Sequence, residues 1–156
     1  MACPYFIPTE KFEDGGWPHR PRLPLGNGWR GLCTAPGHEQ VAPSDDELRQ
    51  YCNLGYAARC SRLPDQRRFD AARFSVARDR DQRIEICYVL EAAHRPGAHG
   101  VLAYDATEQR WAVTHPDPRI QAMASCYLES YFHRRRKAPF DSPRSLRAGS
   151  AATNSA

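Results

Sequence analysis

The first 43 residues limit most strongly what this chain can fold into. More than half of its 13 prolines and ten glycines lie there. Proline removes a backbone donor and fixes φ, and glycine costs backbone entropy, so this segment is predicted to contain little helix or sheet. The segment is also rich in aromatic and aliphatic residues, which is not the composition of a disordered chain. An irregular segment that stays ordered needs something that organises it.

Four cysteines are candidates for that role. Cys3, Cys33, Cys52 and Cys60 stand near prolines, glycines or a predicted helix end, and 29, 18 and seven residues separate them. Thiolates that ligate an iron–sulfur cluster must converge, and glycine permits the close backbone approach that this requires. The sequence therefore predicts that these four cysteines bind metal. His38 is the first candidate for a substitute ligand.

Two kinds of metal centre suit four cysteines. Structural zinc usually takes its ligands as close CxxC pairs, because one short turn then supplies two thiolates. This chain contains no CxxC, whereas a cubane accepts ligands from separate segments. The spacing favours a [4Fe–4S] cluster as the cofactor. One alternative is a zinc ion, and the other is that the cysteines are structural and bind no metal. Neighbouring residues expected to shield such a site from water are Tyr5, Phe6, Trp29, Leu32, Tyr51, Leu54 and Tyr56.

Chain length and hydropathy indicate a single globular domain without a membrane span. A chain of 156 residues can bury one hydrophobic core without covalent cross-links. No apolar run approaches the roughly 18 residues of a membrane span, and residues 1–16 lack the basic and apolar regions of a secretory signal. We therefore expect a cytoplasmic protein with no membrane partner. In that compartment thiols stay reduced, so spaced cysteines indicate metal ligands before disulfides.

Regular periodicity begins after residue 43. Ser44 and Glu47 have the spacing of a capping box, which predicts a helix from Ser44 to about Ala57 or Ala58 that carries Cys52. Four strands are predicted at residues 73–78, 83–92, 101–105 and 110–114, with turns at 79–82, 94–100 and 106–109. A last helix is predicted to begin near Asp117 and Pro118. Its apolar stripe comprises Ile120, Met123, Ala124, Tyr127, Leu128 and Tyr131.

These elements predict an α+β fold. It consists of an irregular, Pro/Gly-rich, metal-binding N-terminal half, a four-strand antiparallel meander and a C-terminal helix. Residues 1–137 are expected to form a single domain, in which 1–64 is the cysteine-rich metal-binding part and 65–137 is the meander plus helix. The small, polar and aperiodic residues 138–156 are expected to be a disordered tail.

The two other cysteines are predicted to fill the core. Cys87 falls within a predicted strand and Cys126 within the last helix, and a free cysteine behaves as a small buried hydrophobe. The chain shows no GxSxG, P-loop or dinucleotide fingerprint, so the sequence favours a protein that is not an enzyme.

A basic cluster ends the last predicted helix. Arg134, Arg135, Arg136 and Lys137 account for most of the net charge of +4. Cations at a helix C-terminus complement the helix dipole, which is a structural explanation. Clustered arginines can also neutralise nucleic-acid phosphates, although no aromatic residues are interleaved with them in a stacking motif.

The sequence thus yields two hypotheses of different class. The first is an iron–sulfur protein, with a [4Fe–4S] cluster used for electron transfer, redox sensing or structural support. Such a protein implies a redox or assembly partner protein, because a fully ligated cluster exchanges electrons but has no open iron site for a substrate. The alternative is a zinc-stabilised binding module that contacts nucleic acid or an acidic partner through the basic helix end.

Overall fold

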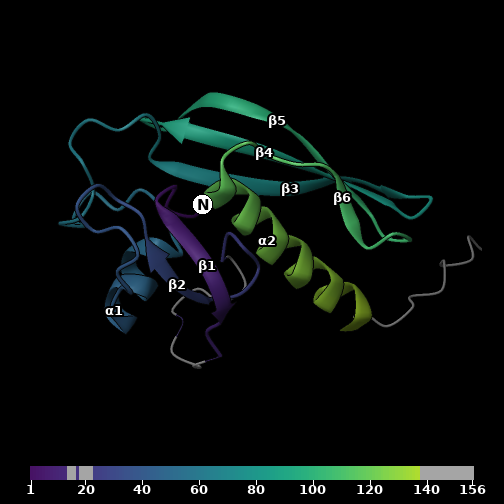
Figure 1. Cartoon of the computed structure of the whole chain (residues 1–156), viewed down its shortest axis with the longest axis horizontal. Helices are drawn as coiled ribbons and strands as arrows, with labels where there is room; N and C mark the ends of the chain where they lie inside the picture. The colour runs from purple at the N-terminus through teal and green to yellow at the C-terminus, as the bar shows by residue number, and fades with distance from the viewer. Residues whose placement is uncertain (14–16, 18–22, 138–156) are drawn as a thin grey trace, which may run out of the picture.

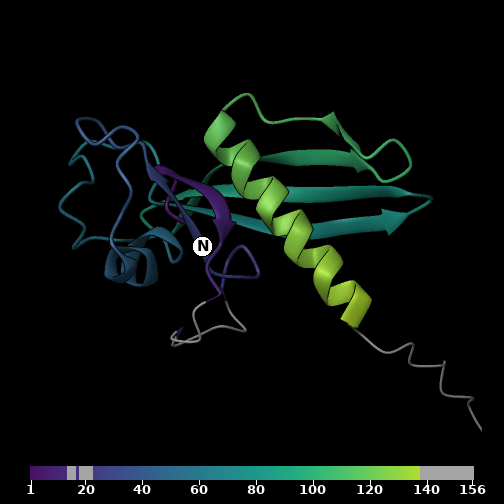
Figure 2. The same cartoon turned by 60° about the horizontal axis from the view of Figure 1, so that its bottom comes forward.

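A four-stranded antiparallel sheet forms one layer of the fold, and the long helix α2 (Pro118–Lys137) runs obliquely across one face of it (Figure 1; Figure 2). The computed structural model describes residues 1–13, 17 and 23–137. The sheet has the order β3-β4-β5-β6, a simple meander, so the predicted meander is confirmed. Its strands are β3 (Ala71–Arg80), β4 (Arg83–Ala92), β5 (Arg95–Asp105) and β6 (Arg110–Val113).

The alternation of β4 positions the sheet against the helix. Ile84, Ile86 and Leu90 are buried. Their spacing follows the period of two, which predicted that they lie on one face of the strand. On α2 (Pro118–Lys137) the residues of the predicted stripe are buried or half-buried. The Phe74 ring of β3 stacks on the Tyr127 ring of the helix, with 6.0 Å between centroids.

The third strand begins six residues earlier than predicted. Residues 95–100 belong to β5, so the predicted turn at 94–100 is wrong. The chain reverses at Ala93 and His94, which both have positive φ. The misleading signal was Pro96 and the nearby glycines. Proline is tolerated there because residues 95–100 pair with β4 alone, and β6 pairs with β5 only from Ala103 onward.

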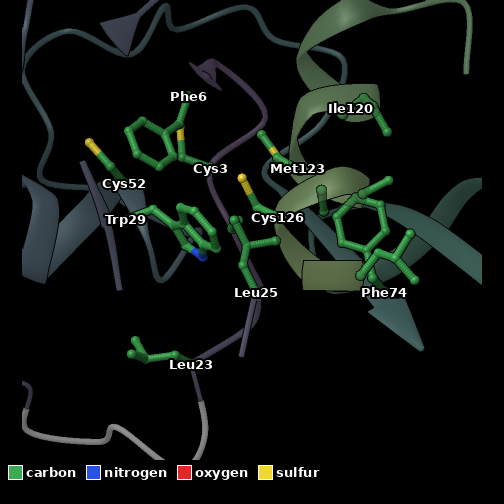
Figure 3. Packing of buried hydrophobic residues seen from close by; sticks show 14 of the residues in the cluster. Cys3, Phe6, Leu23, Leu25, Trp29, Cys52, Phe74, Ile120, Met123 and Cys126 are labelled. Atoms are coloured by element: carbon green, nitrogen blue, oxygen red, sulfur yellow. The ribbon is translucent and has the colours of Figure 1, made fainter. Parts of the chain in front are cut away.

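The N-terminal half contains a small two-stranded sheet that the sequence pattern does not predict. Strand β1 (Phe6–Lys11) pairs antiparallel with β2 (Trp29–Cys33), and Phe6 lies opposite Cys33. A hydrogen-bonded bridge between Ala2 and Ala72 joins this half to the meander, with two backbone bonds of 2.7 and 2.8 Å. A single core runs through both halves, and it includes Phe6, Trp29 and Leu25 as well as residues of α2 (Figure 3).

The helix predicted from Ser44 is shorter than expected. The capping box between Ser44 and Glu47 is present, and the helical segment consists of α1 (Asp45–Glu47) followed by a π-helical turn, η2 (Leu48–Cys52). The predicted end at Ala57 or Ala58 is wrong, because the chain leaves the helix at Asn53 and turns through positive φ at Gly55 and Tyr56.

The predicted tail, residues 138–156, lies outside the described residues. Within the described part of the chain, no helix is both long and apolar enough to cross a membrane.

Candidate metal centre

Cys3, Cys33, Cys52 and Cys60 line one pocket. They come from four separate segments: the residues before β1, the end of β2, the end of η2 and the loop that follows it. All four are free thiols. The first three are each 8% exposed, while Cys60 is half-buried. The structure thus brings together the four cysteines that the sequence singled out.

Backbone hydrogen bonds fix the positions of these cysteines. The Cys3 amide donates to the Cys52 carbonyl oxygen over 2.9 Å. Cys33 donates to the Val41 carbonyl over 2.8 Å and accepts from the Gln40 amide over 2.9 Å. Cys52 ends the π-helical turn, a rare geometry that is frequent at functional sites.

Asn53 clamps the segment that carries Cys52 to the strand that carries Cys33. Its side chain accepts from the Trp29 amide at 3.0 Å and donates to the carbonyl oxygens of Trp29 at 2.9 Å and Leu48 at 3.0 Å. It is 1% exposed. Asn53 is not among the residues that the sequence predicts for the site, because the predicted helix extends past it, whereas in the structure the helical segment ends there. The available signal was an asparagine next to a cysteine, since Asn side chains satisfy free backbone groups where helices end.

The pocket wall is mainly apolar. The residues that line it with the cysteines include Tyr5, Phe6, Tyr51 and Leu63, so three of the seven residues predicted to shield the site do line it. Trp29, Leu32, Leu54 and Tyr56 lie outside its lining. Trp29 is instead buried in the core (Figure 3).

Burial controls the protonation of two of these thiols, Cys3 and Cys52. Desolvation raises the pKa of Cys3 from 9.0 to about 12, although a hydrogen bond from the Tyr5 backbone amide to the thiol opposes that rise. Desolvation also raises the pKa of Cys52, and the proximity of Cys3, Cys33 and Cys60 adds to it. Without a cation the Cys3 and Cys52 thiols are therefore neutral at pH 7, and ligation of a metal must displace their protons.

One ion pair forms part of the pocket wall. Arg62 Nη2 donates to Glu47 Oε2 over 2.8 Å, and the same carboxylate oxygen accepts from the Ser44 amide over 2.7 Å. Both Glu47 and Arg62 line the pocket. The second guanidinium nitrogen, Arg62 Nη1, is buried and has no hydrogen-bond partner among the described residues. Such a buried donor usually has a partner, so this one marks a place for an acceptor.

The remaining cysteines lie elsewhere. Cys126 is buried on α2 near Met123 and apart from Cys52 (Figure 3). The prediction that Cys126 is a core residue is therefore confirmed. Cys87 is only half-buried on β4. Among the described residues the pocket lining includes no histidine, so His38 is not part of it.

The pocket does not have the geometry of a ready-made site for one ion. In the described part of the chain, no three or more His, Cys, Asp or Glu side chains form a group that could hold a metal ion. Tetrahedral zinc with Zn–S bonds of about 2.3 Å would place its sulfurs about 3.8 Å apart. A cluster is larger than one ion and accepts thiolates that are farther apart.

The basic helix end is partly engaged within the fold. Arg135 Nη1 donates to Asp79 Oδ2 over 2.8 Å, and the Arg134 guanidinium lies 5.9 Å from the Tyr127 ring centroid. Arg136 and Lys137 are exposed. All four cations of the cluster are thus exposed, and Arg134 and Arg135 also contact residues of α2 and β3.

Comparison of the chain with known proteins does not identify a family or a function for this site. No known protein family, curated protein or solved structure matches the chain.

Proposed function

We propose that Cys3, Cys33, Cys52 and Cys60 hold a [4Fe–4S] cluster. The observation that carries this proposal is that four cysteines from four separate segments line a single pocket. Cys126 belongs to the same hydrophobic core but does not line this pocket. Four reduced thiols at one place are chemically suited to a soft, thiophilic metal.

The surroundings of the thiols suit a cluster. The apolar wall would exclude water, and the Tyr5 backbone beside Cys3 opposes the rise in the pKa of that thiol and so favours the thiolate. Polar backbone groups near the sulfurs, together with burial, are means by which proteins set a cluster's reduction potential. Arg62 Nη1 adds a buried donor at the pocket wall that a thiolate or a cluster sulfide would satisfy.

Four thiolates leave no open iron site, so the proposed roles are electron transfer, redox sensing or structural support. Cys60 is the most exposed of the four ligands, and the neighbouring Ala58 and Arg59 are exposed as well. A redox partner protein would approach the cluster from this side, because the other three thiols are buried.

The second candidate is a structural zinc ion in a module that contacts nucleic acid or an acidic protein. The specific observation in its favour is that Arg136 and Lys137 are exposed at the end of α2. This alternative requires the four sulfurs to draw closer together than a cluster does. It predicts a salt-sensitive interaction with DNA or RNA that Arg136→Gln and Lys137→Gln together weaken, and that Arg59→Gln does not.

One measurement separates these candidates. The protein is purified without oxygen, its visible spectrum is recorded, and iron, acid-labile sulfide and zinc are quantified. The cluster proposal requires a brown protein with about four iron and four sulfide per chain. A colourless protein with one zinc would contradict it and support the alternative. A folded protein that lacks both metals would contradict both.

A further inference from the structure

A second cleft opens beside the candidate metal centre. Its volume is about 830 Å³, and it lies between the start of α2, the ends of β4 and β5 that meet near Leu90 and Ala98, and the N-terminal segment around Tyr5. Apolar side chains form much of its lining: Tyr5, Ile7, Phe69, Leu90, Ala98 and Ile120. This size and this lining are those of a small-molecule site.

The shape of the cleft depends on Gly97. A Cβ atom at this position would lie 2.9 Å from the Phe69 ring, so glycine allows that ring to lie against β5. The Phe69 ring is in turn covered by the Arg68 guanidinium, 5.0 Å from its centroid. One wall of the cleft is therefore an aromatic ring with a cation beside it.

The charges that face the cleft are unbalanced. Asp117 and Arg119 form a salt bridge, in which Arg119 Nε donates to Asp117 Oδ1 over 2.9 Å. Arg68 is exposed and forms no ion pair with any described residue. The formal charge left over at the cleft is therefore the positive charge of Arg68.

His115 supplies a polar group whose orientation is fixed. Its Nδ1 accepts from the Asp117 amide over 2.9 Å, so the neutral ring carries its proton on Nε2. The Tyr88 ring packs edge-on against the imidazole, with 4.7 Å between centroids. The imidazole can donate one hydrogen bond from Nε2 without breaking the bond that orients it.

From these contacts we propose that the cleft binds a small organic anion with a flat apolar body, of the class of aromatic carboxylates. The apolar body lies against Phe69, Leu90 and Ala98, and the carboxylate lies near Arg68 and His115. This site is separate from the thiol pocket, although Tyr5 lines both. The proposal does not depend on which metal the cysteines hold.

The test uses 2-naphthoate and its neutral analogue 2-naphthalenemethanol as probes on the full chain, with binding followed by saturation-transfer NMR of the probes. We expect naphthoate to bind about fivefold more tightly than the alcohol, which is the upper end of what one exposed ion pair contributes. Arg68→Gln should weaken naphthoate binding about fivefold and leave the alcohol unchanged. Arg59→Gln, at an exposed arginine outside the cleft, should change neither.

A filling substitution tests the place of binding. Ala98→Phe should abolish binding of both probes, because the added ring occupies the cleft. Equal binding of the two probes, or naphthoate binding that Arg68→Gln does not weaken, would overturn the proposal. So would the absence of naphthoate binding to the unmodified protein. Metal content is measured on the same samples, so that a failure at the cleft is distinguished from a failure at the metal centre.

Discussion

The backbone amide of Cys3 donates to the carbonyl oxygen of Cys52 over 2.9 Å. Two proposed ligands that are far apart in sequence are thus held by main-chain atoms, independently of any bond through their sulfurs. The side chains need only rotate or shift to reach a shared centre. A site whose backbone is preorganised in this way loses little conformational entropy when it binds its metal.

Serine substitutions of single cysteines should separate ligands from core residues. Replacement of Cys3, Cys33, Cys52 or Cys60 should remove most of the bound metal, because serine is a poor ligand for a soft metal at neutral pH. Cys87→Ser and Cys126→Ala are the matched controls and should keep it. Metal and sulfide per chain are the readout. Full metal content in Cys3→Ser would contradict the N-terminal part of the proposed site.

Asn53→Ala should destabilise the protein by about 3 kcal/mol, because it removes three buried hydrogen bonds from the Asn53 side chain to backbone groups of Trp29 and Leu48. Urea unfolding measures the loss. Asn27→Ala is the control, since among the described residues the half-buried Asn27 side chain forms one hydrogen bond, to Ser130 Oγ at 3.0 Å. Equal losses in the two variants would show that Asn53 is not the clamp proposed for the Cys52 segment.

Arg62→Gln should lower the reduction potential of the cluster. A hydrogen bond and a positive charge beside the cluster favour its more negative, reduced state, so their removal favours the oxidised state. The expected decrease is about 40 mV, which corresponds to about 1 kcal/mol for one electron. Redox titration followed by visible absorption measures it. Arg59→Gln, on the same segment but exposed, should leave the potential within error, and an equal decrease there would exclude a specific role for Arg62.

The metal-free fold should lose stability above pH 9. Burial raises the pKa of Cys3 from 9.0 to about 12 and that of Cys126 from 9.0 to about 12. The unfolded chain therefore releases these protons first. The contribution of these neutral thiols to the free energy of unfolding is fully present below pH 9 and is lost as the pH rises toward 12. The free energy of unfolding then falls by up to about 1.4 kcal/mol per pH unit for each thiol.

Urea midpoints at pH 7, 9 and 10 measure this dependence. Cys126→Ala should reduce the slope, since one buried thiol is removed. A metal-free protein whose stability is the same at pH 7 and pH 10 would contradict the assignment of neutral, buried thiols.

The meander and α2 could be predicted because each has a uniform periodicity along the chain. Ile84, Ile86 and Leu90 follow a period of two, and the stripe from Ile120 to Tyr131 follows the helical period. Both periods report which face is buried, and burial is what forms these elements. The α+β class with a C-terminal helix followed directly from them.

The sheet of β1 and β2 could not be predicted in the same way. Trp29, Gly31 and Cys33 alternate as buried residues in β2, but Gly31 carries no apolar signal. It is glycine because a Cβ atom there would lie 2.0 Å from the Ile7 carbonyl oxygen. The pairing with β1 is thus encoded by a close backbone approach, which hydrophobic patterning does not report.

The four thiols of the candidate site could be predicted from the sequence because cysteine is a metal ligand. The polar residues around them could not, because only the tertiary fold brings them to the site. Asn53 and Arg62 are ordinary polar residues in the sequence. Their roles follow from hydrogen bonds to Trp29 and Glu47, partners that only the folded chain places beside them.

The bridge between Ala2 and Ala72 has a consequence for the order of events during synthesis. The residue before Cys3 reaches its final place only when the first strand of the meander is available to bond it. When a nascent chain has been synthesised as far as Cys60, it contains all four thiols, but strand β3 has not yet been synthesised. Insertion of the metal is therefore expected to be a late step, after the ribosome has released the meander.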